Sequence, residues 1–207
     1  MRGNKTKNIQ NYNDMFKGND LTSLDGLETW DTSGAATMRY MFSDSDPNST
    51  ANYAHGSYIT NIDSVSGWNV SNVTDLMGTF AGIIPDDLTA LANWDVCRYI
   101  FTPLSGVRAH KVTLMSRIFE GDRSITTLSA LEYWYDDLGT PENITRVTID
   151  YAFAYMYGLT DISALNTWTG GNNKVQTYSM RGLMRGDYNI ASGSAKTYLE
   201  NACFKML

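Results

Sequence analysis

The chain repeats a short segment that ends in tryptophan, and this repetition limits the folds open to it. The tryptophans are Trp30, Trp68, Trp94, Trp134 and Trp168, and they close the segments LTSLDGLETW, ITNIDSVSGW, PDDLTALANW, ITTLSALEYW and LTDISALNTW. A second segment recurs between the tryptophans, in forms such as GAATMRYMF, NVTDLMGTF, KVTLMSRIF and RVTIDYAF. One unit of this size cannot bury its own apolar face, so we expect the units to stack on one another.

The spacing of the repeat predicts a fixed unit with insertions. Phe16 and Phe42 are 26 positions apart, and so are Trp68 and Trp94. Longer intervals contain polar stretches that indicate inserted loops, at residues 43–57, 95–108, 135–143 and 170–174. We predict a single repeat domain over residues 1–207 with about six units, roughly 9–30, 31–68, 69–94, 95–134, 135–168 and 169–207.

Each half of the unit has its own expected local structure. The LTxLxxLxxW segment is rich in apolar and β-branched residues, which favours a short strand followed by a tight corner. The V-T-x-M-x-x-x-F segment has apolar residues three and four apart, which favours a short helical or 3-10 turn. The predicted fold class is therefore an α/β solenoid: a leucine-rich-repeat-like stack with short parallel strands on one side and short helical or 3-10 turns and inserted loops elsewhere. The Trp and Phe side chains are expected to form its buried stack, and a solvent-facing, sugar-binding stripe is the alternative.

Three segments carry a resemblance to a known family. WDTSGAATMRYMF, GWNVSNVTDLMGTF and LTSLDGL resemble the W-D-T-S-N-V-T-x-M-x-x-M-F repeats of BspA-like leucine-rich-repeat surface proteins, also known for Mycoplasma-type lipoprotein repeats. The resemblance extends over residues 9–184 and is strongest over residues 21–94. It implies a solenoid on a bacterial or parasite surface or on a virus particle, with adhesive or structural roles and no catalytic residues. The later units depart from the pattern, and no signal peptide is visible, which raises the virion alternative.

The sequence offers little chemistry for catalysis. Its two histidines, His55 and His110, fall in inserted loops, and Cys97 and Cys203 are expected to be free buried thiols. The net charge is −6 and no run of Lys and Arg is present, which argues against nucleic acid as a partner. No apolar run is long enough for membrane insertion. We predict no enzyme, no catalytic or metal-binding residue and no cofactor, and we assign no binding residue.

The predicted function is that of a non-enzymatic, exposed structural or interaction protein. Its expected partners are proteins, either on a host surface or in neighbouring subunits, with a possible homo-oligomer or particle lattice. Its expected location is the extracellular surface or the virion. The alternative is a carbohydrate-binding module that uses exposed aromatic residues, for which the candidates are Tyr53, Tyr58, Tyr99, Tyr133 and Tyr135. The tripeptide Arg185-Gly186-Asp187 matches an integrin-binding sequence, but Gly and Asp are expected there because a turn follows each second segment.

Overall fold

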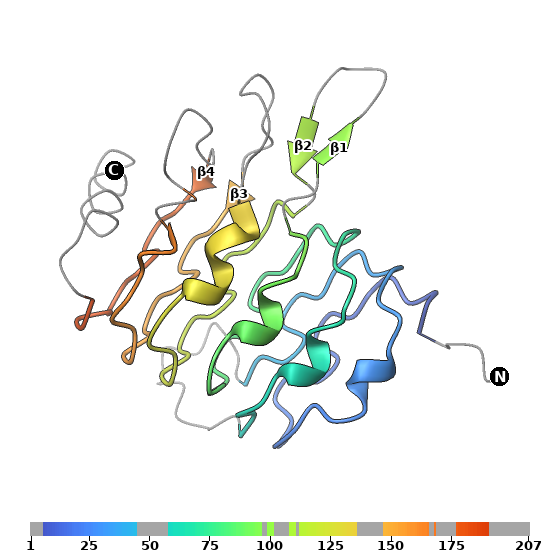
Figure 1. The fold of residues 1–207 in the computed structure, drawn as a ribbon, viewed down its shortest axis with the longest axis horizontal. Coiled ribbons are helices and arrows are strands. Elements are labelled where there is room, and N and C mark those ends of the chain that lie inside the picture. The colour runs from blue at the N-terminus through green and yellow to red at the C-terminus, as the bar shows by residue number, and fades with distance from the viewer. Residues whose placement is uncertain are drawn as a thin grey trace.

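Six similar segments lie side by side in chain order, from the blue end to the red end of Figure 1. The computed structural model describes residues 6–44, 58–96, 99–101, 108–110, 112–135, 147–165, 168 and 177–190. We call the six aligned stretches turn segments 1 to 6, and they cover residues 9–19, 35–44, 73–83, 112–122, 147–156 and 179–187. They correspond to the V-T-x-M-x-x-x-F half of the sequence repeat.

A recurring set of backbone hydrogen bonds joins adjacent turn segments. Between segments 2 and 3, the N–H groups of Met38, Tyr40, Phe42 and Asp44 donate to the carbonyls of Asp75, Met77, Thr79 and Ala81. The same set recurs at the other junctions, from Tyr12 N–H to Thr37 O at 3.0 Å through to Tyr155 N–H to Arg185 O at 2.8 Å. Parallel bridges connect Asn11, Thr37, Asp75, Leu114 and Thr148 in turn. Strand β3 (Val147–Thr148) then pairs in parallel with β4 (Thr177–Ser179).

The other backbone groups of a turn segment pair within the segment. In segment 4, Ile118 N–H donates to Met115 O, Glu120 N–H to Arg117 O, and Asp122 N–H to Phe119 O. Along a turn segment, successive N–H groups thus donate in turn to the neighbouring segment and to the same segment. The buried backbone groups are therefore hydrogen-bonded without long strands. This alternation needs a positive φ at one recurring position, where φ lies between 51° and 61° for Asp14, Tyr40, Gly78, Arg117, Tyr151 and Gly182.

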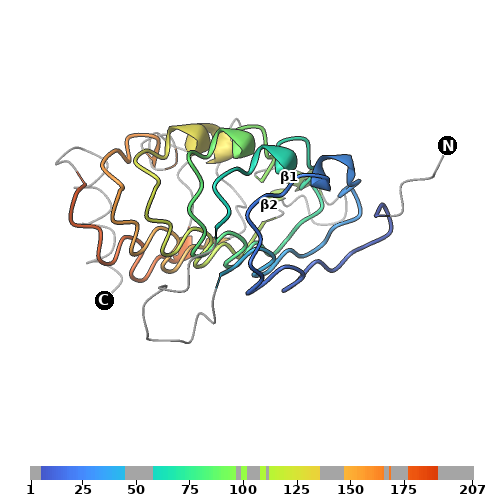
Figure 2. The same cartoon turned by 90° about the horizontal axis from the view of Figure 1, so that it is seen from below.

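The opposite face of the stack carries a row of 3-10 helices, seen along the upper edge of Figure 2. They are η1 (Leu27–Thr29), η2 (Asp63–Val65), η3 (Thr89–Leu91) and η4 (Ser129–Tyr135). Each lies in a tryptophan segment, where apolar residues recur at every third position, as in Leu88, Leu91 and Trp94. Three residues per turn is the period of the 3-10 helix, so this spacing places all three side chains on one side.

The local predictions for the two halves of the repeat were therefore wrong in part, because the helical turn expected in the V-T-x-M segments lies in the other half. The helical turns lie in the tryptophan segments and the parallel pairing lies in the V-T-x-M segments. A strand-like contact does begin one tryptophan segment, at the parallel bridge between Thr127 and Asp161. The four-residue apolar spacing of the V-T-x-M segments reflects a run of successive β-turns rather than a helix.

A hairpin begins in the insertion predicted at residues 95–108 and ends beyond it. Strands β1 (Tyr99–Phe101) and β2 (Arg108–His110) pair antiparallel, with Tyr99 opposite His110. The insertion expected at residues 43–57 begins later, because Ser43 and Asp44 belong to turn segment 2. The rest of that insertion, residues 136–143 and residues 170–174 lie outside the described residues.

Two aromatic stacks fill the core between the faces. Phe16, Phe42, Phe80, Phe119 and Phe153 stack with centroid distances of 5.7–6.0 Å and interplanar angles of 2–15°. Trp30, Trp68, Trp94 and Trp134 stack at 6.1–6.5 Å and 3–9°. Each indole N–H from Trp68 onward donates to a carbonyl of the preceding unit, at Leu27, Val65, Leu91 and Leu131. These indoles are 1–4 % exposed, so the alternative of a solvent-facing tryptophan stripe is wrong.

Candidate functional site

The described part of the chain shows no constellation for metal or membrane chemistry. No group of three or more His, Cys, Asp or Glu side chains that could hold a metal ion occurs among the described residues. Over the same residues, no helix combines the length and apolarity needed to cross a bilayer. His110 ends β2, whereas His55, Cys97 and Cys203 lie outside the described residues.

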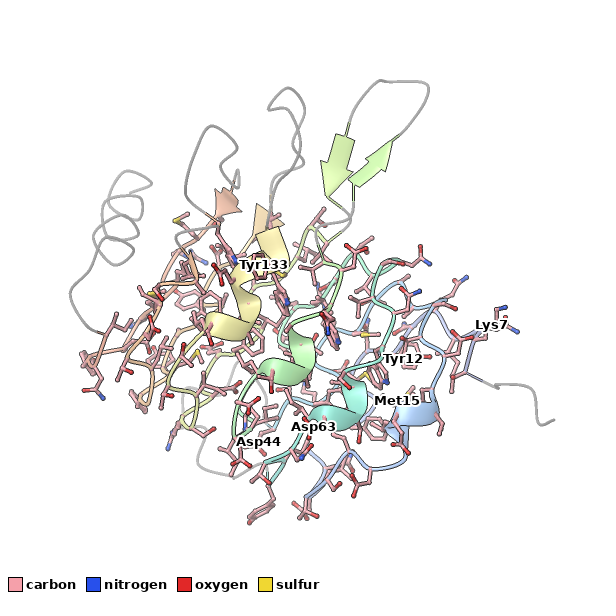
Figure 3. All side chains as sticks on the ribbon, in the orientation of Figure 1. Lys7, Tyr12, Met15, Asp44, Asp63 and Tyr133 are labelled. Atoms are coloured by element: carbon pink, nitrogen blue, oxygen red, sulfur yellow. The ribbon has the colours of Figure 1, made fainter. Side chains whose placement is uncertain are left out.

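The tyrosines proposed for carbohydrate binding are only partly accounted for. Tyr58 is 55 % exposed, and Tyr133 on η4 is 66 % exposed and labelled in Figure 3. Tyr99 and Tyr135 belong to β1 and η4, but their side chains, like all of Tyr53, lie outside the described residues. Within the part of the chain that the structure describes, Tyr58 and Tyr133 share no ring contact. They do not form a platform with each other.

A different aromatic cluster lies on the outer side of turn segments 4 to 6. Three tyrosines lie along turn segment 5 and just after it, namely Tyr151, Tyr155 and Tyr157. Arginines flank them from both neighbours: Arg117 and Arg123 from segment 4 and its end, and Arg181 and Arg185 from segment 6. We call these seven residues the tyrosine–arginine surface.

Three arginines of this surface lie against tyrosine rings. The Arg117 guanidinium carbon is 5.1 Å from the Tyr151 ring centroid, and Arg181 approaches the same ring at 5.9 Å. Arg123 lies 5.5 Å from the centre of the Tyr157 ring. These distances are in the range of cation–π attraction. The Tyr157 ring also meets the Tyr155 ring edge-on at 6.5 Å.

Glycines on turn segment 6 make room for two of these rings. A Cβ at Gly182 would overlap the Tyr151 ring, and a Cβ at Gly186 would lie 2.7 Å from Tyr155 Cδ1. The rings therefore rest on the backbone of the next segment. Asn189 further ties the segments together, because its side-chain amide donates to the Tyr157 carbonyl at 2.7 Å. The Tyr151 and Tyr155 rings are thus held in place rather than free to swing.

Three of the four arginines keep their charge available. Arg117 forms a 2.8 Å ion pair with the buried Glu120. Arg123, Arg181 and Arg185 are exposed, and none of them forms an ion pair within the part of the chain that the structure describes. The surface is thus locally cationic on a chain whose net charge is −6.

Sequence reasoning missed this surface because the arginines are far apart along the chain. A search for runs of Lys and Arg finds nothing, since stacking alone brings these side chains together. The available signal was register: Arg117 and Tyr151 occupy the same position in successive repeats, as do Arg123 and Tyr157. Aligning the repeats position by position would have placed each pair side by side.

The half-buried Asp187 and the buried Asp122 have raised pKa values. Burial raises the pKa of Asp187 to about 7, although its Oδ1 accepts a 2.7 Å hydrogen bond from Met156 N–H. Burial also raises the pKa of Asp122 well above its ordinary value. The N–H groups of Gly82 and Ile83 near Asp122 already donate to Glu120 and Phe80 carbonyls, which leaves that carboxylate little compensation.

The raised pKa of Asp187 predicts a dependence of stability on pH. Between the ordinary pKa of 3.8 and about 7, the folded chain holds a proton that the unfolded chain has lost. The contribution of Asp187 to stability is therefore greatest below the ordinary pKa and falls as pH rises toward 7. We expect Asp187→Asn to flatten part of this fall, as measured by urea midpoints across that range. Asp25→Asn, which removes an exposed charge, is the control, and an equal flattening there would contradict the assignment.

The Arg185-Gly186-Asp187 tripeptide has the geometry of a turn. Gly186 has φ of 87°, and the Asp187 carboxylate is directed at the Met156 backbone. An integrin-type ligand presents its carboxylate to the receptor, whereas this one is half-buried and already engaged. The arginine of the tripeptide belongs instead to the tyrosine–arginine surface.

The repeated turn ladder and the paired aromatic stacks define a tandem-repeat protein. The chain belongs to the family described as "Mycoplasma protein of unknown function, DUF285", whose model matches residues 2–81 and again residues 51–135. The two matches overlap over residues 51–81, which is consistent with internal repetition. Comparison with curated proteins and with solved structures gave no match.

Proposed function

We propose that the chain is a non-enzymatic attachment or assembly module, built as a BspA-like leucine-rich-repeat solenoid and displayed on a cell surface or a virion. The observation that carries the proposal is the aromatic core, in which five phenylalanines stack in consecutive repeats at 5.7–6.0 Å. Such a core fixes the spacing of the residues on its surface. A rigid stack of this kind suits the display of a binding face better than a reaction that needs a closed pocket.

Two further features support the proposal. The family that the chain belongs to carries a Mycoplasma description, and members of the BspA-like repeat family carry the same domain. The exposed tyrosines and arginines are of the types enriched at protein–protein interfaces. Protein partners, on a host surface or in neighbouring subunits, are therefore the proposed ligands.

The proposal is tested by locating the chain. Intact source cells or purified particles are treated with a protease that cannot enter them, and the released peptides are identified by mass spectrometry. We expect peptides of this chain among those released, at a yield that indicates many copies. Recovery of the chain only after lysis, from the soluble interior, would overturn the proposed function.

Assembly and attachment are separated by a second measurement. Light scattering coupled to size-exclusion chromatography gives the mass of the purified chain over a range of concentrations. A mass that rises with concentration supports subunit assembly. A constant monomer mass leaves attachment to another protein as the role of the module and eliminates self-assembly.

A further inference from the structure

We infer that the tyrosine–arginine surface is a docking site for a protein segment rich in carboxylates. This inference rests on the proposed function, because it names the partner class of an attachment module. It goes beyond that function by assigning the site to turn segments 4 to 6. The occupant is an acidic stretch of a partner protein laid across the three segments.

The arginines are preorganised for ligand binding, which is the first support for the inference. Arg181 lies over the Tyr151 ring, which is itself held against the next segment, so less side-chain entropy is lost when this arginine binds. Arg123 lies over the Tyr157 ring. A guanidinium packed by its face against a ring keeps its N–H edges available for carboxylates in a two-pronged arrangement. Among the described residues, the three exposed arginines form no ion pair that a bound carboxylate would have to replace.

The second support is the contrast with turn segments 1 and 2, which also carry basic side chains. There, Lys17 pairs with Asp14 at 3.3 Å, and Arg39 pairs with Asp75 at 2.9 Å. The positive charge of these segments is already compensated within the chain. The three exposed arginines near segment 5 are not compensated in this way among the described residues.

The surroundings of the tyrosine rings favour a protein ligand over a sugar or a nucleic acid. Sugars and bases bind aromatic side chains through an open ring face. The Tyr151 ring has the Gly182 backbone on one side and Arg117 near it, and the Tyr157 ring carries Arg123. The Tyr151 ring is thus covered by backbone and arginine, whereas Tyr157 is 41 % exposed beside Arg123. The arginines on these rings select for anionic groups. The net charge of −6 also repels long polyanions, while a short acidic segment meets mainly the local positive charge.

The geometry sets the size of the occupant. Neighbouring backbones in a hydrogen-bonded ladder lie about 4.8 Å apart, so arginines on segments 4 and 6 are separated by about 10 Å of backbone. A few carboxylates of one extended segment can reach both sides of the tyrosine row. Electrostatic attraction of this kind is screened by salt.

The experiment is a binding titration of the full chain with a fluorescein-labelled peptide of alternating glutamate and glycine, followed by anisotropy. We expect salt-dependent binding that weakens at least about tenfold in the triple variant Arg123→Gln, Arg181→Gln, Arg185→Gln. The matched control is Lys7→Gln, Lys17→Gln, Arg39→Gln, which removes the same charge from segments 1 and 2 and their vicinity, and it should change the affinity less than about twofold. Circular dichroism establishes that each variant is folded.

A second variant tests whether binding requires the arginine guanidinium groups or only their positive charge. Lysine at the same three positions keeps the charge but loses the planar fork, so we expect a clear loss of affinity. No peptide binding by the parent chain, equal losses in the two glutamine triples, or full binding by the lysine triple would each overturn the inference. Tighter, arginine-dependent binding of heparin or of a single-stranded oligodeoxythymidine would also overturn it. If the chain is exposed on the surface but does not bind the peptide, only this inference is overturned. If the chain is confined to the interior, the proposed function is overturned whatever the titration shows.

Discussion

Replacing Trp94 with alanine is expected to lower the free energy of unfolding by about 3–5 kcal/mol, the range for removing a large buried aromatic side chain. The Trp94 indole is 3 % exposed and stacks between Trp68 at 6.5 Å and Trp134 at 6.4 Å. Its N–H also donates to the Val65 carbonyl at 3.0 Å, which the variant leaves without this partner. The loss therefore affects packing on both sides and one hydrogen bond between units.

The same substitution at Trp30 is the matched control. Trp30 is only half-buried and stacks on a single tryptophan, Trp68. We expect a loss of about half that of Trp94→Ala or less, because less apolar area leaves the water on folding. Urea unfolding followed by circular dichroism measures both variants. Equal losses at the two sites would show that the tryptophan stack does not carry the stability assigned to it.

Replacing Gly78 with alanine is expected to cost about 2–4 kcal/mol. Gly78 has φ of 61°, but Tyr40, Arg117 and Tyr151 adopt 51–61° at the same repeat position without being glycine. Backbone strain alone is therefore tolerated there. The larger part of the cost is steric, because a Cβ at Gly78 would overlap the Tyr40 ring.

Two comparisons isolate this steric term. Gly26 has φ of 94° with no atom within 4 Å of its would-be Cβ, so Gly26→Ala reports the backbone cost alone, about 1 kcal/mol. In a Tyr40→Ala background, Gly78→Ala should cost about 1–3 kcal/mol less than in the parent chain. An unchanged cost in that background would show that the ring is not the obstacle. The measurement is the urea midpoint of the four variants and the parent chain.

The repeat, the two recurring segments and the burial of their aromatic side chains could be predicted from the sequence. These depend on local patterns: five tryptophans close equivalent segments, and apolar residues precede them in register. The identity of the helical and paired halves could not be predicted in the same way. A spacing of three and four residues suits both a short helix and a run of β-turns, and only the hydrogen bonds between segments 2 and 3 and their equivalents distinguish the two.

The candidate site depended on tertiary structure even more strongly. Arg117, Tyr151 and Arg181 are far apart in the chain, and their contacts exist only because each repeat lies against the next. The sequence by itself determined that the units must stack, because a single unit cannot enclose its apolar residues. The stacked structure decided which exposed residues become neighbours, since that depends on register between segments and on glycines such as Gly182 that allow a ring to lie on the adjacent backbone.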